Sequence, residues 1–153
     1  MKKVIALLIL MCAVSFGLSA QGWQYDRGKG ILESTPLYLT GDYDAPTVLA
    51  VCAGKNKDGQ ELVLCSLFGE CEIYDFKDTQ QYVIFEYAEG RQKIPIKQVD
   101  MDGKKFQAFF LKDPHKLIGL FEEIDWFTIS LPLYRHGVQT FNFSAEGYPL
   151  VVP

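Results

Sequence analysis

Three cysteines within one short stretch are the residues of this chain best placed to do chemistry. Cys52, Cys65 and Cys71 fall within residues 47–73, TVLAVCAGKNKDGQELVLCSLFGECEI. A disulfide stabilises a fold by restricting the unfolded chain, whereas a lone thiol reacts only as its thiolate. The cysteines lack the Cys-x-x-Cys spacing of zinc and redox motifs. The stretch therefore predicts one cystine and one leftover thiol.

The two apolar runs around Asp58-Gly59 predict a β-hairpin, because both residue types tolerate the positive φ of a two-residue type I′ turn. With this loop, Cys52 lies directly opposite Cys65 in a non-hydrogen-bonded pair, where Cα atoms approach to about 4.5 Å. That separation is at the short end of the disulfide range. Cys52–Cys65 is then the disulfide and Cys71 the possible free thiol. A four-residue loop at 56–59 instead leaves Cys71 to pair with either of the other two.

The two histidines are the candidate general bases of the chain. His115 is expected at the start of a helix and His136 in a turn, and neither lies near a Gly-x-Ser-x-Gly nucleophile elbow. They also lack the His-x-x-x-His spacing of a local metal site. Both are therefore predicted to be ordinary surface residues.

The spacing of the paired carboxylates does not match that of a catalytic dyad or of a complete calcium loop. Asp42-x-Asp44 and Asp100-x-Asp102 resemble fragments of a calcium loop, but the later ligands are missing. Glu122-Glu123 occupy adjacent helical positions and face different directions. We predict no catalytic residue, no cofactor site and no metal site, and a protein that is not an enzyme.

Aromatic residues are plentiful and recur at strand spacing. In a barrel they could line a ligand cavity, although most such residues form the core of the fold. Whether the interior is filled or hollow stays open at this point. The residues concerned are Tyr82, Phe85, Tyr87, Phe106, Phe109, Phe110, Trp126, Phe127, Phe141 and Phe143.

The N-terminal stretch, residues 1–20, has the layout of a signal peptide. Lys2 and Lys3 precede an apolar core, and small residues precede Gln21. The core is short for a membrane span, so cleavage after Ala20 is predicted, with an uncleaved anchor as the alternative. We expect a periplasmic or secreted protein with no stable membrane insertion after cleavage.

The predicted mature chain is acidic. Removing Lys2 and Lys3 from the 15 basic residues leaves 13 against 19 acidic ones, a net charge of −6. Such a surface supplies no cationic footprint for phosphate backbones or anionic lipid, which excludes nucleic acid as the expected partner. The length suits one domain with its own core.

Short runs with period-two alternation recur along the chain, as in antiparallel β-proteins. The strongest is 81–87, where Val83 and Phe85 share one face and Tyr82 and Ile84 the other. Because both faces are largely apolar, we expect both to be covered. Similar alternation occurs at 127–133 and 141–145, and shorter runs at 23–25, 31–32 and 106–111.

One helix is predicted near 114–123. Asp113 is a suitable N-cap, Pro114 fits the first helical position, and Leu117 and Phe121 share one face. With eight or nine strands and no internal repeat, the chain is predicted to form a single mostly-β domain over 21–153. The architecture expected is an antiparallel β-sandwich or a partly closed barrel.

The order of these features resembles the small exported β-sandwich proteins associated with type VI secretion loci, and their phage-encoded or invasion-associated relatives. Trp23 follows the signal peptide, an apolar strand ends at Cys52, and a strand with a polar turn spans 83–90. Phe143 and Gly147 match the Phe-x-x-x-Gly signature near the end of that family. The resemblance covers about residues 23 to 147.

The chain departs from that family at two extra cysteines, Cys65 and Cys71, and at a glutamate–glycine pair where an arginine–aspartate strand end is usual. The family has no established catalytic residues, so the resemblance implies a β-sandwich fold and an exported location only. The predicted function is a non-enzymatic protein-interaction or accessory module of the bacterial envelope, its partner another protein. The alternatives are an inhibitor of a cationic hydrolase such as lysozyme, or a barrel binding a small apolar ligand.

Overall fold

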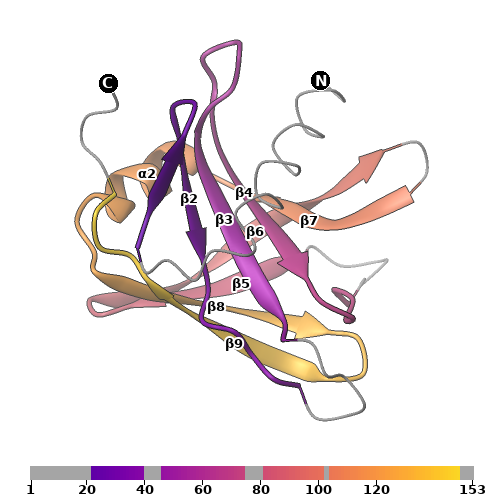
Figure 1. Cartoon of the computed structure of the whole chain (residues 1–153). Coiled ribbons are helices and arrows are strands. Elements are labelled where there is room, and N and C mark those ends of the chain that lie inside the picture. Colours follow the sequence, from indigo (N-terminus) through magenta and orange to yellow (C-terminus); the bar gives the residue numbers. More distant parts are fainter. Residues whose placement is uncertain (1–21, 40–45, 75–80, 102–103, 149–153) are drawn as a thin grey trace.

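A computed structural model describes residues 22–39, 46–74, 81–101 and 104–148. Within these ranges the chain is mostly β, with nine antiparallel strands and one short helix (Figure 1). The predicted signal peptide, residues 1–20, lies outside the described residues. The strands are β1 (Gln24–Asp26), β2 (Lys29–Glu33), β3 (Val48–Lys55), β4 (Glu61–Phe68), β5 (Tyr82–Tyr87), β6 (Gly90–Met101), β7 (Lys104–Leu111), β8 (Trp126–Leu133) and β9 (Gly137–Ser144), and the helix is α2 (Pro114–Phe121).

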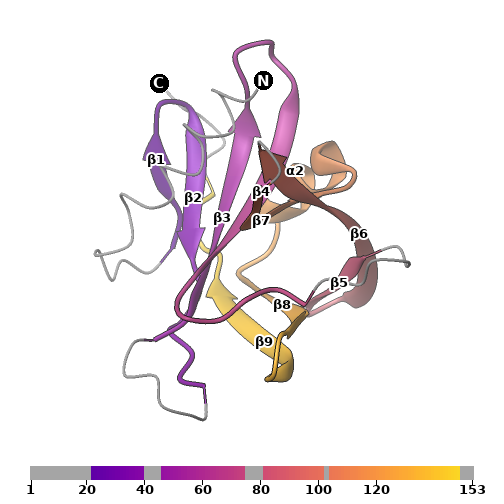
Figure 2. The same ribbon diagram turned by 90° about the vertical axis from the view of Figure 1, so that its right-hand side faces the viewer.

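The strands form one curled sheet in the order β1-β2-β3-β4-β7-β6-β5-β8-β9. Strand β6 pairs with β5 through its first half and with β7 through its second, and so connects the two halves of the sheet. Its register shifts between Gln98 and Asp100, an irregularity of the kind that bends a strand. The sheet curls into a half-barrel (Figure 2), which confirms the predicted mostly-β fold with a partly closed barrel.

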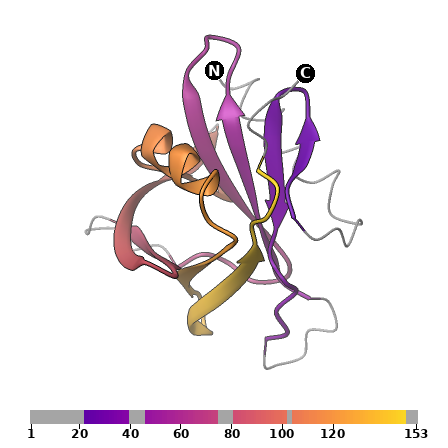
Figure 3. The ribbon, with the colours of Figure 1, turned by 90° about the vertical axis from the view of Figure 1, so that its left-hand side faces the viewer.

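The two ends of the sheet approach each other without forming a continuous ladder. The Thr35 N–H, just after β2, donates to the Asn142 carbonyl of β9 at 2.8 Å. The Trp23 N–H donates to the Glu146 carbonyl at 3.4 Å. These contacts hold the chain after β9 alongside the first hairpin (Figure 3).

Aromatic rings fill the concave side of the half-barrel. Phe127 is fully buried and lies 4.6 Å from Phe143, 5.0 Å from Phe85 and 5.2 Å from Phe121, measured between ring centroids. Trp23 packs on Phe121 at 5.1 Å. The space in which an interior ligand cavity was considered is therefore occupied by packed rings.

The alternation predicted at 127–133 is observed, but the prediction made for the two faces of 81–87 is not fully met. Strand β8 buries Phe127, Ile129, Leu131 and Leu133, as the period of two requires. In β5 the prediction that both faces are covered is wrong, because Tyr82 is 45% exposed on the outward face. That outward face forms part of the candidate site described below.

Helix α2 begins at Pro114 with Asp113 as its N-cap residue, as predicted, but the Asp113 side chain does not cap the helix. Asp113 has a left-handed backbone conformation with φ of 56°, and its side chain makes no capping hydrogen bond. The helix is instead fixed by burial of Leu117 and Phe121 against the aromatic core. Tertiary packing therefore replaces the local capping signal.

The β3–β4 hairpin has a register that neither predicted loop allows. Asn56 pairs with Gln60, and the turn between them ends at Gly59 with φ of 77°. The Asn56 side-chain oxygen accepts the N–H groups of Asp58 and Gln60, each at 2.9 Å. This is a three-residue loop that ends in a left-handed glycine. Both the two-residue loop Asp58-Gly59 and the four-residue loop are therefore wrong.

Candidate functional site

The register of the β3–β4 hairpin separates the cysteines predicted to form a disulfide. Cys52 pairs with Leu64, and Cys65 pairs with Val51. A shift of one residue turns a side chain to the other face of a sheet, so Cys52 and Cys65 belong to different buried clusters. The described cysteines form no disulfide, so the predicted Cys52–Cys65 pairing is wrong.

The third cysteine, Cys71, is buried in the main core. Its sulfur lies 3.7 Å from the Thr47 hydroxyl oxygen. Burial raises the pKa of the Cys71 thiol, and burial raises that of Cys65 further, with a smaller contribution from Cys52. Buried thiols with raised pKa values are poor nucleophiles, because little thiolate is present near neutral pH.

The histidines lie apart from each other, in different surroundings. The exposed imidazole of His115 has its Nδ1 2.9 Å from Glu61 Oε1. His136 lies in the β8–β9 turn, and its carbonyl accepts the Gln139 side-chain amide at 2.7 Å. Across the described ranges, no group of three or more His, Cys, Asp or Glu side chains could hold a metal ion. Asp42, Asp44 and Asp102, of the predicted calcium-loop fragments, lie outside these ranges.

A change of partner along β8 opens a gap in the sheet. The β5–β8 ladder ends at Ile84 opposite Ser130, so two residues further along this register Tyr82 would lie opposite Pro132. Proline has no N–H, and this pair cannot complete its hydrogen bonds. The two strands separate from this point.

The segment around Ile73 takes the place that β5 leaves. Ile73 forms an antiparallel bridge with Leu133. The Tyr74 N–H donates to the Pro132 carbonyl at 3.0 Å, and the Tyr134 N–H donates to the Glu72 carbonyl at 2.8 Å. The end of β8 is thereby held by a segment about 60 residues away in the sequence.

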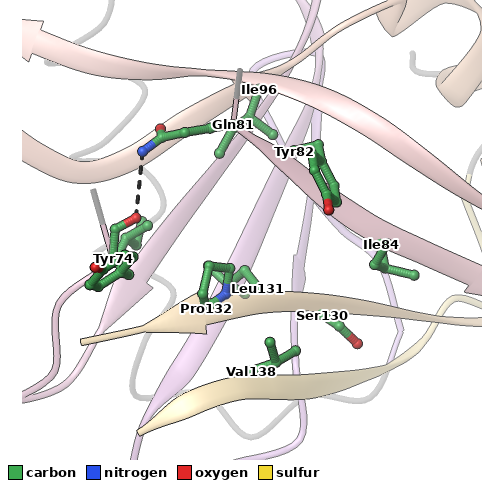
Figure 4. Close-up of a pocket in the computed structure, with 10 residues that line it drawn as sticks. Tyr74, Gln81, Tyr82, Ile84, Ile96, Ser130, Leu131, Pro132 and Val138 are labelled. Carbon is green, nitrogen blue, oxygen red and sulfur yellow. Dashed lines mark hydrogen bonds between the residues drawn. The ribbon is translucent and has the colours of Figure 1, made fainter. Parts of the chain in front are cut away.

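Between the separated strands lies a pocket of about 420 Å³, which we call the β5–β8 groove. Tyr82 and Ile84 line it from β5, Pro132 from β8 and Val138 from the edge strand β9 (Figure 4). Tyr74 closes one end. The volume lies within the range of small-molecule and side-chain pockets.

The polar groups of the groove are few and lie at its ends. The Gln81 side-chain amide donates to the Tyr74 carbonyl at 3.5 Å, a long hydrogen bond that spans the groove (Figure 4). The Lys93 amino group lies 4.6 Å from the centre of the Tyr82 ring. The lining is otherwise largely apolar, so the arrangement can bind an apolar group but offers no general acid–base pair.

Exposed aromatic residues surround the β5–β8 groove. Tyr74, Tyr82 and Tyr134 are 39%, 45% and 48% exposed. The rings of Tyr74 and Tyr134 stack at 6.4 Å, and the Arg135 guanidinium lies 5.2 Å from the Tyr134 ring. Tyrosine and arginine are among the residues that most often dominate binding energy at protein interfaces.

One local feature of the sequence indicates where this groove forms. Pro132 interrupts an otherwise regular alternating strand, and a proline in such a position indicates an edge or a change of pairing. The partner segment at Ile73 had no comparable local signal. Of the aromatic residues considered as cavity lining, only Tyr82 lines the groove.

Comparison of the chain with protein-family profiles, with curated proteins and with solved structures finds no match in any of the three. The resemblance to exported β-sandwich proteins of type VI secretion loci therefore stays a prediction. In the described part of the chain, no helix is both long and apolar enough to cross a membrane.

Proposed function

We propose that this protein is a non-enzymatic, exported binding module of the bacterial envelope that acts by contact with another protein. The observation that carries this proposal is the cluster of exposed Tyr74, Tyr82 and Tyr134 around an open apolar groove. Surfaces that combine tyrosine anchors with a pocket are typical of protein interfaces. The periplasmic or secreted location follows from the predicted signal peptide.

In this proposal an apolar side chain of the partner inserts between Tyr82 and Pro132. Val138 extends the contact to the open edge of the sheet, where it is 68% exposed. Lys93 and Arg135 lie beside the tyrosines and favour a partner with acidic groups next to its apolar anchor.

The test is affinity capture from envelope extract and from secreted fluids, followed by mass spectrometry at low and moderate salt. The bait is the exported protein, compared with Tyr82→Ala in the groove and Tyr38→Ala as the control. Tyr38 is 72% exposed and does not line the groove. We expect a reproducible partner that Tyr82→Ala loses and Tyr38→Ala keeps. Equal capture by both variants would contradict the groove as the contact site.

One observation favours the inhibitor function as a second candidate. The β3–β4 hairpin projects beyond the neighbouring strands (Figure 1), and its turn residues Lys57, Asp58 and Gly59 are exposed. A projecting loop on an acidic protein could enter the cleft of a basic hydrolase. Salt-sensitive capture of such a hydrolase, lost when the turn is changed and kept in Tyr82→Ala, would select this function.

The pocket volume favours a small apolar ligand as a third candidate, now placed on the outer surface because aromatic rings fill the interior. Native mass spectrometry of the exported protein distinguishes this case. A bound small molecule that Val138→Asp releases would support it, whereas protein without added mass would favour the protein partner.

A further inference from the structure

Strand β9 forms one edge of the sheet and carries nothing that would prevent another strand from pairing with it. Its sequence, GVQTFNFS, contains no charged residue and no proline. It pairs with β8 through eight consecutive residues without a register shift. Exposed edge strands usually carry charges, prolines or bulges that block pairing with another chain. Because β9 has none of these, its edge is a template for a further strand.

The opposite edge of the sheet, at β1, is protected. Strand β1 has only three residues and ends at Asp26. Arg27 follows in a left-handed conformation, with φ of 51°, and its side chain lies 4.0 Å from the Asp26 carboxylate. Short length and charge both discourage strand addition. Of the two edges of the described sheet, only β9 is therefore open, which suits a closed pair of copies and not a fibre.

The hydrogen bonds of β8 show which residues of β9 face the open edge. The Pro132 carbonyl accepts the Tyr74 N–H on the side of β8 that lies away from β9. Val138 lies opposite Pro132, and in an antiparallel ladder such a pair exchanges no hydrogen bonds. The N–H and carbonyl of Val138 therefore point to the open edge, and those of Thr140 do so as well.

A contact at the far end of β9 confirms this direction. The Asn142 carbonyl, two residues beyond Thr140, accepts the Thr35 N–H from the edge at 2.8 Å. The chain after Thr35 then diverges from β9 (Figure 3). Among the described residues, none hydrogen-bonds to the backbone of Val138 or Thr140. The free stretch of the edge is thus 137–141.

We propose that two copies of this protein form a dimer by antiparallel pairing of their β9 strands, with Gln139 on the twofold axis. In this register Val138 lies opposite Thr140 of the partner subunit, and each such pair exchanges two backbone hydrogen bonds. The paired stretch is 137–141 in both copies and ends before the Thr35 contact. Because β9 is uncharged, no like charges meet across the paired strands although the chain as a whole is acidic.

The dimer brings the two β5–β8 grooves onto one continuous surface. A twofold axis perpendicular to the sheet keeps the outward faces of both copies on the same side. Val138 lines the groove and stays on that outward face. If the groove binds a partner as proposed above, the dimer can engage two contact sites at once and gain avidity.

Sedimentation equilibrium of the exported protein, from micromolar to submillimolar concentration, tests the proposal. We expect an apparent mass that rises to about twice that of the monomer. Val138→Lys/Thr140→Lys sets lysine against lysine in both pairs and should stay monomeric, as should Val138→Glu/Thr140→Glu. An equimolar mixture of these two variants should regain the doubled mass, because each lysine then lies opposite a glutamate. Unaltered protein that stays monomeric, or a mixture that does, overturns the proposal.

Single added cysteines test the register and do not depend on the charged variants. Gln139→Cys places two thiols in a non-hydrogen-bonded pair, whose Cα separation of about 4.5 Å permits a disulfide. Under mild oxidation it should give covalent dimer at least about tenfold faster than Val138→Cys or Thr140→Cys, whose thiols do not lie opposite each other. The unaltered protein, with its described cysteines buried, gives the background rate.

Cross-linking that is as fast through position 138 or 140 overturns the register, and the absence of any cross-link above background overturns the dimer. Tyr82→Ala, in the groove, should dimerise like the unaltered protein. Loss of partner capture in Tyr82→Ala and loss of the dimer are therefore separate results, and the failure of one proposal leaves the other standing.

Discussion

The two halves of the sheet differ in how they use their outward face. In the half formed by β2, β3, β4 and β7, consecutive residues are buried on both sides, and β3 is buried from Val48 to Gly54. In the half formed by β5, β8 and β9, burial alternates, and the outward residues Tyr82 and Val138 are exposed. Both halves share one aromatic core on the concave side.

This difference shows that one sheet can carry two kinds of contact surface. A strand that is apolar on both faces must be covered on both, and in β3 the residues of both faces are buried. The alternating half is complete in itself and leaves tyrosines at its surface. The groove in that half arises where Pro132 ends a ladder.

The largest expected effect comes from the core that both halves share. Phe127→Ala removes a fully buried ring in contact with Phe85, Phe121 and Phe143, and should lower the free energy of unfolding by about 3–5 kcal/mol. Urea denaturation measures the change. The neighbouring Trp126→Ala, whose ring is 44% exposed, should cost less than about 1 kcal/mol. Similar costs for the two variants would contradict the assignment of the faces.

Outward-facing substitutions should separate the two halves. Leu64→Asn places an amide in the second buried cluster, with Ile31 and Cys52, at a position that is 0% exposed, and should cost about 2–4 kcal/mol in the full-length chain. Val138→Asn, in the other half, changes a residue that is 68% exposed and should cost less than about 0.5 kcal/mol. Both values come from urea denaturation of the same full-length chain. If Leu64→Asn were as mild as Val138→Asn, the burial of the second cluster would be contradicted.

The strands and the core were predictable because a period of two is a local property of the sequence. Phe127, Ile129 and Leu131 alternate in β8 as the sequence indicates. The hairpin register was not predictable from the Asp58-Gly59 turn signal. The Asn56 side chain binds two backbone N–H groups and lengthens the loop by one residue.

The candidate site could not be predicted from the sequence for a different reason. The β5–β8 groove depends on Ile73 pairing with Leu133 across about 60 residues, and no local pattern reports such a contact. Pro132 indicated only that pairing had to change somewhere along the strand. The cysteine pairing failed with the register, since one residue of slip moves Cys65 to the opposite face from Cys52.

Replacing a turn glycine by alanine should lower the stability by a similar amount in the two halves of the sheet. Gly59 and Gly137 have φ of 77° and 68°, and an added Cβ would meet nothing within 4 Å at either position. Gly59→Ala and Gly137→Ala should each cost about 1–2 kcal/mol, from the left-handed conformation alone. Gly119→Ala, in α2 and equally unobstructed, should instead stabilise by about 0.5–1 kcal/mol. Thermal denaturation of the three variants shows whether each substitution lowers or raises the stability. A stabilising Gly59→Ala would contradict the observed turn.

The smallest effect concerns the tyrosines that join the first hairpin to the chain after β9. Burial, followed by the charge of Glu122, raises the pKa of Tyr148 from 10.0 to about 12. Burial also raises the pKa of Tyr25, whose hydroxyl donates to the Gly147 carbonyl at 3.1 Å. The unfolded chain therefore releases these protons at lower pH than the folded protein does.

Because the folded protein holds its protons longer, the stabilisation is fully present below pH 10 and is lost as the pH rises from about 10 to 12. Tyr148→Phe should make the fall in melting temperature over this range shallower than in the unaltered protein. Tyr38→Phe, at a side chain 72% exposed, is the matched control and should leave the slope unchanged. If Tyr148→Phe does not alter the slope, Tyr148 ionises at the same pH in the folded and unfolded protein. The packing of Tyr148 against the first hairpin would then be looser than the structure describes.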